Sequence, residues 1–291
     1  MPERVGAVPT ARDWWLLLEP LHAVVYFDDG CRRSMDEVGM RGFWMGYFAG
    51  RAAPMGPVGP EVVGATFFNF HPDLVRRAVP DAWSFADPGR IWAARRYGAA
   101  GTLRRCVPDI EAGAARAVPL LSRLVDGAVG AGRPLFAATR ATGAPDDPVE
   151  ALWHACTCLR EHRGDGHVAA LTASGLDGAE ALVLFAASEG LPDDLFIRSR
   201  GWSASEWAQA GERLARRGLL DDSGLTTGGA GLRRDIEAMT DRQAARPFGS
   251  LDDRMLHELA DTLRPMAAAV HGAGIIGYPN PMGLPEPSPA G

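Results

Sequence analysis

The 291-residue sequence is poor in cysteine and has no long apolar run. Its four cysteines are Cys31, Cys106, Cys156 and Cys158. They form no C-x-x-C pair, and a structural zinc site needs more ligands at closer spacing, so we predict buried free thiols in a reducing compartment. The apolar runs are shorter than a membrane span, and the amino-terminal segment has no apolar signal core. These absences predict a cytoplasmic protein with no membrane segment.

Motifs for nucleotide binding and for several familiar catalytic sites are also missing. No phosphate loop of the form G-x-x-x-x-G-K-[ST] occurs, and the segment APMGPVGP with Gly56 and Gly59 does not form one. The G-x-S-x-G nucleophile elbow and the H-E-x-x-H zinc motif are absent from the sequence. We therefore expect no cofactor and no bound metal.

The balance of charge argues against one class of partner. The 30 basic and 36 acidic residues give a net charge of −6, and the pI is about 5.7. This is the wrong sign for a protein that is held to phosphates by bulk electrostatics. We expect nucleic acid not to be a partner, although a local basic patch would change that expectation.

Length and composition predict a mainly α-helical protein with two helical domains. The sequence is 46% hydrophobic and 23% charged, as is ordinary for a globular protein of this size. Segment 140–148 is rich in Pro, Gly and Asp and is the best candidate for a linker. We expect an amino-terminal helical domain over 1–139, a second domain over 140–272, and a poorly ordered Pro/Gly-rich tail over 273–291.

Two helical segments bear on the candidate site. Residues 35–50 are apolar with aromatic side chains on every face, which predicts one helix that is buried on all sides. Residues 149–163 have helical periodicity, and the following Gly164, Asp165 and Gly166 predict a break before the next helix begins at His167.

The second half of the sequence has the element order of a winged helix. Ser203 and Glu206 form a capping box at the start of an amphipathic helix, and Gly218 follows as its terminating residue. The segment LLDDSGLT predicts a two-strand hairpin, and another helix opens near Gly228. The stretch RLARRGLL, followed by the hairpin, resembles the MarR family of winged helix-turn-helix proteins at the corresponding place.

The same module is poorly equipped to read DNA. A second helix that enters the major groove would present Ser205, Gln209, Glu212, Arg213 and Arg216. The glutamate offsets part of the arginine charge. The hairpin tip, with its two adjacent aspartates at 221 and 222, would place carboxylates where a phosphate contact needs a cation. We therefore favour a winged helix that serves as a scaffold.

Several stretches resemble one family across nearly the whole chain. They are LEPLHAVVYF (18–27), RGFWMGYFAGRAAPMGPVG (41–59), FNFHP with PDAW (68–83) and LREHRGDGHVAAL (159–171). They are similar to an actinobacterial family of SalK-type or MarR-like helix-turn-helix proteins, and the dominance of Ala and Arg over Lys is typical of such genomes. The resemblance implies the fold and a frequent setting near secondary-metabolite genes, and it carries no established activity.

The densest polar cluster lies in residues 159–171. We select His162, Asp165, His167 and Glu161 as candidate catalytic residues, because a carboxylate beside a histidine can fix its tautomer and two differently placed groups can act as acid and base. Arg163 is a candidate for holding a carboxylate or an enolate of the substrate. An ordinary salt-bridge network is the alternative interpretation. A metal site made from the same residues would have a spacing that matches no familiar motif.

Polar residues also interrupt apolar segments of the first domain. The candidate substrate-binding residues are His22, Tyr26, Trp44, Tyr47, Arg51, Asn69 and His71, together with Arg163. A buried arginine needs a partner or an anionic ligand, and a few convergent polar groups in apolar surroundings are typical of a small-molecule site. We expect these residues to share a pocket with the 159–171 cluster.

Three functions fit these observations. The first is a protein that binds a small apolar, aromatic or polyketide-like ligand and acts as a cofactor-free acid–base enzyme of secondary metabolism, catalysing cyclisation, isomerisation or elimination. The rival is a MarR-like transcription regulator that responds to such a ligand. The third is a ligand-binding or resistance protein without catalysis, and the sequence does not separate it from the first. A homodimer is compatible with all three.

Overall fold

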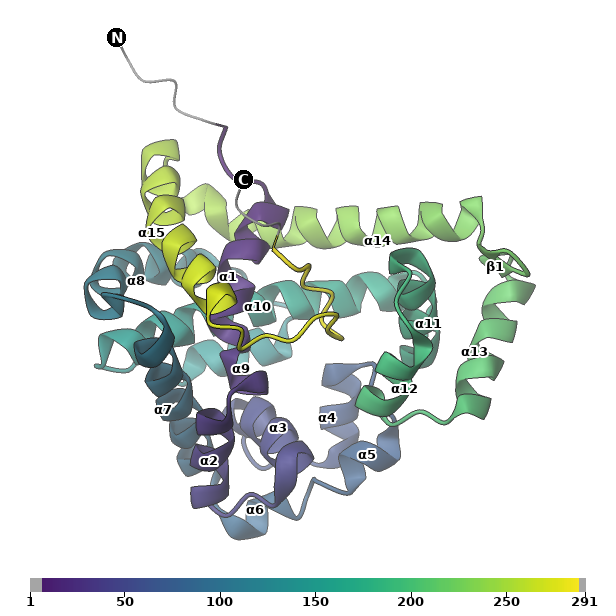
Figure 1. The fold of residues 1–291 in the computed structure, drawn as a ribbon, viewed down its shortest axis with the longest axis horizontal. Helices are drawn as coiled ribbons and strands as arrows, with labels where there is room; N and C mark the ends of the chain where they lie inside the picture. The colour runs from purple at the N-terminus through teal and green to yellow at the C-terminus, as the bar shows by residue number, and fades with distance from the viewer. Residues whose placement is uncertain (1–6, 288–291) are drawn as a thin grey trace.

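The computed structural model describes residues 7–287, and this part of the chain is mainly α-helical (Figure 1). The helices of the first half are α1 (Ala11–Phe27), α2 (Asp29–Glu37), α3 (Gly42–Ala52), the 3-10 turn η1 (Ala53–Met55), α4 (Pro60–Phe67), α5 (Pro72–Arg76), α6 (Ala82–Phe85), α7 (Pro88–Cys106), α8 (Ile110–Gly127) and α9 (Pro134–Ala141). The second half comprises α10 (Pro148–Ala173), α11 (Gly178–Glu189), α12 (Asp193–Arg200), α13 (Ala204–Arg216), strands β1 (Leu220–Asp221) and β2 (Gly224–Leu225), α14 (Thr227–Ala245), η2 (Arg246–Ser250) and α15 (Asp253–Gly272).

Helix α10 organises the packing. It contacts α1, α7, α8, α9 and α14, and in Figure 1 it runs alongside the long helix α14. Its first half is buried in the larger of two hydrophobic clusters, whose most buried side chains include Phe48, Phe136 and Trp153. Ala170 and Leu171, near its end, belong to the smaller cluster. One continuous helix therefore joins the two clusters.

The smaller cluster holds α11 to α14 together. Phe196, Trp207, Leu214 and Ile236 are buried in it. The two strands pair antiparallel, with Leu220 opposite Leu225, and connect α13 to α14. The order is thus a short helix, a turn, an amphipathic helix, a hairpin and a long helix, as the sequence predicts.

Local capping explains where α13 begins and ends. The Ser203 side chain accepts the backbone N–H of Glu206, and the Glu206 carboxylate accepts the backbone N–H of Ser203. Gly218 has φ of 68°, a left-handed conformation that glycine adopts without steric cost. The predicted capping box and terminating glycine are both present.

The predicted helix break at Gly164 to Gly166 is wrong, because α10 continues through all three residues. Asp165 is held by the backbone N–H of Phe136, which its carboxylate accepts at 2.9 Å. At Gly166 an added Cβ would lie 2.6 Å from a guanidinium nitrogen of Arg133. This glycine thus allows a close approach of Arg133, and it does not turn the backbone.

The prediction of one helix over 35–50, buried on all sides, is also wrong. The chain leaves helical geometry between α2 and α3, where Gly39 has φ of 96° and Gly42 has φ of 79°. The short α3 then presents two faces. Phe48 is fully buried, whereas Phe43 is 41% exposed. The apolar pattern predicted one helix over these residues, but two glycines in left-handed geometry divide it into α2 and α3.

The described part of the predicted disordered tail is packed against the protein. The carboxamide of Asn280 donates to the backbone oxygens of Gly277 and Leu284, and its oxygen accepts the N–H groups of Met282 and Leu284. Both Ile276 and Leu284 are buried in the larger cluster. These bonds order a segment whose composition alone suggests a loose tail. Residues 288–291 of the predicted tail lie outside the described residues.

Among residues 7–287, no single helix is both long and apolar enough to cross a membrane. Only α10 and α11 taken together reach that length and composition, and they meet at a bend of 100°.

Candidate functional site

A cavity of about 620 Å³ opens between the two hydrophobic clusters. Phe67 and Phe70 from the larger cluster line it together with Leu171 and Leu182 from the smaller one. Its size lies within the range of small-molecule sites, about 300–1,000 Å³. The candidate residues that line it are Tyr26, Trp44, Tyr47, Arg51, Asn69, Glu161, Arg163, Asp165 and His167.

Aromatic rings from α3 and from the loop after α4 form one wall. The ring centre of Tyr47 lies 5.6 Å from that of Trp44 and 5.4 Å from that of Phe70. Tyr26 on α1 extends the wall, with its ring centre 5.2 Å from that of Tyr47. These spacings are those of interacting aromatic pairs, so the wall is a preorganised apolar surface with two phenol groups.

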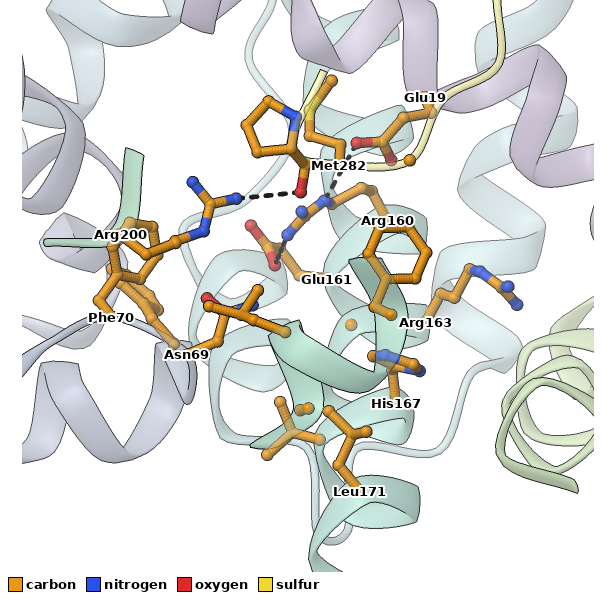
Figure 2. Close-up of a pocket in the computed structure, with 18 of the residues that line it drawn as sticks. Glu19, Asn69, Phe70, Arg160, Glu161, Arg163, His167, Leu171, Arg200 and Met282 are labelled. Atoms are coloured by element: carbon orange, nitrogen blue, oxygen red, sulfur yellow. Dashed lines mark hydrogen bonds and ion pairs between the residues drawn. The ribbon is translucent and has the colours of Figure 1, made fainter. Parts of the chain in front are cut away.

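A chain of buried charges crosses the cavity from α3 to α1. Arg51 Nη2 donates to both carboxylate oxygens of Glu161, at 3.0 and 3.2 Å. Arg160 Nη1 donates to the same carboxylate at 2.8 Å, and Arg160 Nε lies 3.5 Å from Glu19 Oε1 (Figure 2). Burial favours the neutral form of Glu161, but the two arginines outweigh it and hold the pKa of this carboxyl below its ordinary value. Glu161 is therefore ionised and locked between two cations.

Tyr47 belongs to the same electrostatic group. Arg51 Nη1 donates to the Tyr47 hydroxyl oxygen at 3.1 Å. Burial opposes ionisation of the phenol, but the nearby Arg51, Arg200 and Arg160 outweigh it and lower the pKa of Tyr47. This hydroxyl is thus a more acidic group than an ordinary tyrosine.

Asp165 is the cavity carboxyl best suited to exchange a proton near neutral pH. Its Oδ2 accepts the Phe136 N–H, and no described residue bonds its Oδ1. Burial raises the pKa of Asp165 to about 6, against the opposing effect of that hydrogen bond. A general acid or base works best when its pKa lies near the operating pH, and Asp165 meets this requirement.

His167 lines the cavity as a neutral imidazole. Its Nδ1 lies 3.0 Å from Thr240 Oγ1, and that hydroxyl donates its own hydrogen to the Ile236 carbonyl. The hydroxyl must therefore accept from Nδ1–H, which leaves the lone pair on Nε2. Burial lowers the pKa of His167 to about 4. His167 can accept a hydrogen bond through Nε2 at neutral pH.

Arg163 lines the cavity but is already paired. Its guanidinium contacts Asp241 at 2.6 Å and Glu237 at 3.4 Å. The sequence-based role, holding a carboxylate or enolate of the substrate, would require it to leave these partners.

Three of the candidate residues do not line the cavity. His22 is fully buried behind it, between Thr157 Oγ1 at 2.9 Å and the Tyr26 hydroxyl at 2.8 Å. His162 is buried, and its ring meets the edge of the Phe136 ring. His71 caps α5 and contacts Glu206 on α13 at 3.0 Å.

The comparisons with known proteins give one match. A model of a helix-turn-helix family matches residues 11–277. The chain belongs to this helix-turn-helix family. No curated protein and no solved structure matches it.

Arg213 on α13 and Arg217 directly after it are paired within this helix-turn-helix protein. Arg213 contacts Asp177 at 2.6 Å and Glu180 at 2.9 Å, both at the start of α11. Arg217 contacts Glu180 at 3.4 Å and donates to the carbonyls of residues 174 and 175. These two arginines, which a DNA reader would direct to phosphates, are therefore already paired with groups of the protein, whereas Arg216 is exposed.

Sequence reasoning missed several groups that the helix-turn-helix chain brings to the cavity. Among them are Glu19, Phe70, Arg200 and the tail residues Pro281, Met282 and Gly283. Their positions depend on tertiary packing, so no local pattern marks them. An expectation that the sequence has no G-x-G-x-x-G spacing is wrong, because residues 272–277 have one. It begins at the last residue of α15 rather than after a strand, so it lacks the setting of a dinucleotide site.

Metal binding was one alternative for the polar cluster. Within residues 7–287, no three His, Cys, Asp or Glu side chains gather closely enough to hold a metal ion.

The displaced pKa values of His162 and Asp165 on α10 predict how the stability of the fold changes with acid. The pKa of His162 is about 4 in the folded chain and has an ordinary value of 6.5, so acidification between these values protonates the unfolded chain first and destabilises the fold. Asp165 acts in the opposite direction. Its folded pKa of about 6 exceeds the ordinary 3.8, so the folded chain takes up this proton first and is stabilised as the pH falls through 6.

The Asp165→Asn variant should therefore lose more unfolding free energy than the wild type between pH 7 and pH 5, because it lacks this compensation. His162→Gln should lose less. Urea unfolding at the two pH values measures both differences. Equal losses in all three proteins would show that these groups are not shifted.

Proposed function

We propose that the protein binds a small, largely apolar, aromatic or polyketide-like molecule in this cavity and converts it by cofactor-free acid–base chemistry in secondary metabolism. The observation that carries the proposal is the combination of an aromatic wall with ionisable groups of displaced pKa in one cavity. Cyclisation, isomerisation and elimination all need a proton to be removed from one atom and delivered to another. One carboxyl with a pKa near neutrality suits that task.

Asp165 is the proposed general base, and it returns the proton as general acid. The Tyr47 hydroxyl, made more acidic by Arg51, would donate a hydrogen bond to an oxygen that gains charge. His167 would orient the ligand through its Nε2 lone pair. Glu161, a candidate catalytic residue in the sequence, is assigned instead to holding Arg51 and Arg160 in place.

The scaffold proposed for this site has two domains, 1–139 and 140–272, and the second is a MarR-like winged helix. The winged helix is supported by the smaller hydrophobic cluster, which α11 to α14 share, and by the order of α12, turn, α13, hairpin and α14. The first half of α10 and helix α15 pack in the larger cluster with the first domain, so the proposed boundary does not follow the two clusters. In the first turn of α13, where a reading helix meets bases, the Glu206 carboxylate is already bound by His71. This arrangement supports a scaffold role for the module.

A MarR-like, ligand-responsive regulator is the second candidate, and the helix-turn-helix family match favours it. The structure offers little positive charge for this role. Asp221 and Asp222 are exposed at the hairpin, and Arg216 lies 3.9 Å from the Glu212 carboxylate. Both features oppose contact with phosphates.

Occupancy of the cavity can be tested with a neutral aromatic dye. N-phenyl-1-naphthylamine should bind with a rise in fluorescence, because the aromatic wall shields it from water. Ala181 lines the cavity, so Ala181→Phe should weaken this binding by about tenfold or more through overfilling. Ala208 is exposed on α13, and Ala208→Phe serves as the control that should bind as the wild type does. Equal binding by both variants would place the dye elsewhere.

Catalysis can be tested by untargeted mass spectrometry of an extract from producing cells, incubated with the protein. The wild type should consume a compound and form an isomer of it or its elimination product. Asp165→Asn should slow this by about 100-fold or more, the usual contribution of a general acid–base group, with a nearly unchanged melting temperature at pH 7. Unslowed conversion by this variant would refute the role of Asp165. If the wild type converts nothing, a binding protein without catalysis is favoured.

Binding to DNA separates the two candidates. At moderate salt, the folded protein should not shift duplex DNA from its own gene neighbourhood in an electrophoretic assay. A sequence-specific shift with a steep dependence on salt concentration would support the regulator and contradict the scaffold.

A further inference from the structure

The arginines that line the cavity differ in whether a carboxylate lies beside them. Within the described residues, six of them line it: Arg12, Arg51, Arg160, Arg163, Arg200 and Arg233. Five have a carboxylate oxygen within 4.0 Å, supplied by Glu19, Glu161, Glu237 or Asp241. Arg200 has no such partner in residues 7–287. It is the cavity-lining arginine whose charge is uncompensated.

Arg200 is nonetheless buried, with 8% of its surface exposed. Its Nη1 donates to the Ser199 carbonyl and its Nη2 to the Pro281 carbonyl, both at 3.1 Å (Figure 2). The guanidinium lies over the Phe70 ring, 4.6 Å from its centre, and Nε has no hydrogen-bond partner. These contacts hold the group in position without neutralising it.

Burial and two neighbouring arginines make the charged form of Arg200 less favourable. Burial lowers the pKa of Arg200, and the neighbouring Arg51 and Arg160 lower it further. Asn69 also lines the cavity beside Phe70, and its side-chain amide makes no hydrogen bond to a described residue (Figure 2). An uncompensated cation and an unused amide on one wall, next to stacked aromatic rings, are complementary to an anion attached to a ring system.

We infer that the ligand of the cavity is an aromatic compound with an ionised acidic group, and that Arg200 binds this group while the ring system lies against Phe70. This inference rests on the proposed function, because it specifies the ligand of the same site. A carboxylate would give the buried cation its missing counter-charge.

The test uses competition against bound N-phenyl-1-naphthylamine by two matched probes, 2-naphthoate and its uncharged analogue 2-naphthamide. In the wild type, naphthoate should compete about 10- to 100-fold better than naphthamide, the range expected for a hydrogen bond to a charged group. Arg200→Met should abolish this preference. Arg198→Met is the control, because Arg198 is exposed on the same helix as Arg200 and does not line the cavity, and it should keep the preference.

Each outcome is informative. If the dye binds and the two probes compete equally in the wild type, the inference is wrong while the proposed function stands. If the dye and both probes fail to bind, the proposed function fails and the inference falls with it. If Arg200→Met and Arg198→Met lose the preference equally, the charge that selects the anion is not that of Arg200.

A measurement of stability distinguishes a ligand-binding role from a structural one. A buried cation without a counter-charge destabilises the empty protein, so Arg200→Met should melt at the wild-type temperature or above it. A structural role through the Pro281 carbonyl predicts a lower melting temperature. Arg200→Lys, which keeps the charge, should retain part of the preference for naphthoate and would show the effect if the methionine variant did not fold.

Discussion

The bidentate contact between Arg51 and Glu161 is the interaction on which the cavity depends. Removing one member of such a buried pair leaves the other charge without its partner and costs about 3–5 kcal/mol. The pair therefore fixes α3 against α10, and through Tyr47 it fixes the aromatic wall as well. Arg160 extends the same network to Glu19 on α1. Three helices of the cavity are thus positioned by one carboxylate and its neighbours.

The sequence predicted a structural feature correctly where that feature depends only on neighbouring residues. The capping box of Ser203 and Glu206 lies within four residues, and it marks the start of α13 correctly. The error at Gly166 has a distant cause, because the nearby guanidinium belongs to Arg133, far away in the sequence. Apolar periodicity likewise could not show that Gly39 and Gly42 adopt left-handed geometry between α2 and α3.

Some residues of the candidate site could likewise be predicted from the sequence, and others could not. Asp165 and His167 could be selected because polar groups in an apolar helix stand out in the sequence. His162 was selected on the same ground, yet it does not line the cavity, although it lies less than one turn before Asp165 on α10. Its ring is buried against Phe136 of α9, and no sequence pattern shows this tertiary contact. Arg200 could not be identified in advance. Arg200 is singled out because no carboxylate lies near it, whereas the other five cavity arginines each have one. Only the folded structure shows this difference.

The position of the tail in the cavity wall has a consequence for biosynthesis. Translation proceeds from the amino terminus at about 5–20 residues per second, so Pro281, Met282 and Gly283 leave the ribosome after every other lining residue. Before then, the nascent chain can assemble both hydrophobic clusters around α10 and α14, but Arg200 lacks the Pro281 carbonyl and the Phe185 ring lacks its cover from Gly283. A message cut short a few codons before residue 281 would therefore encode a chain that retains most of its core and has an open cavity.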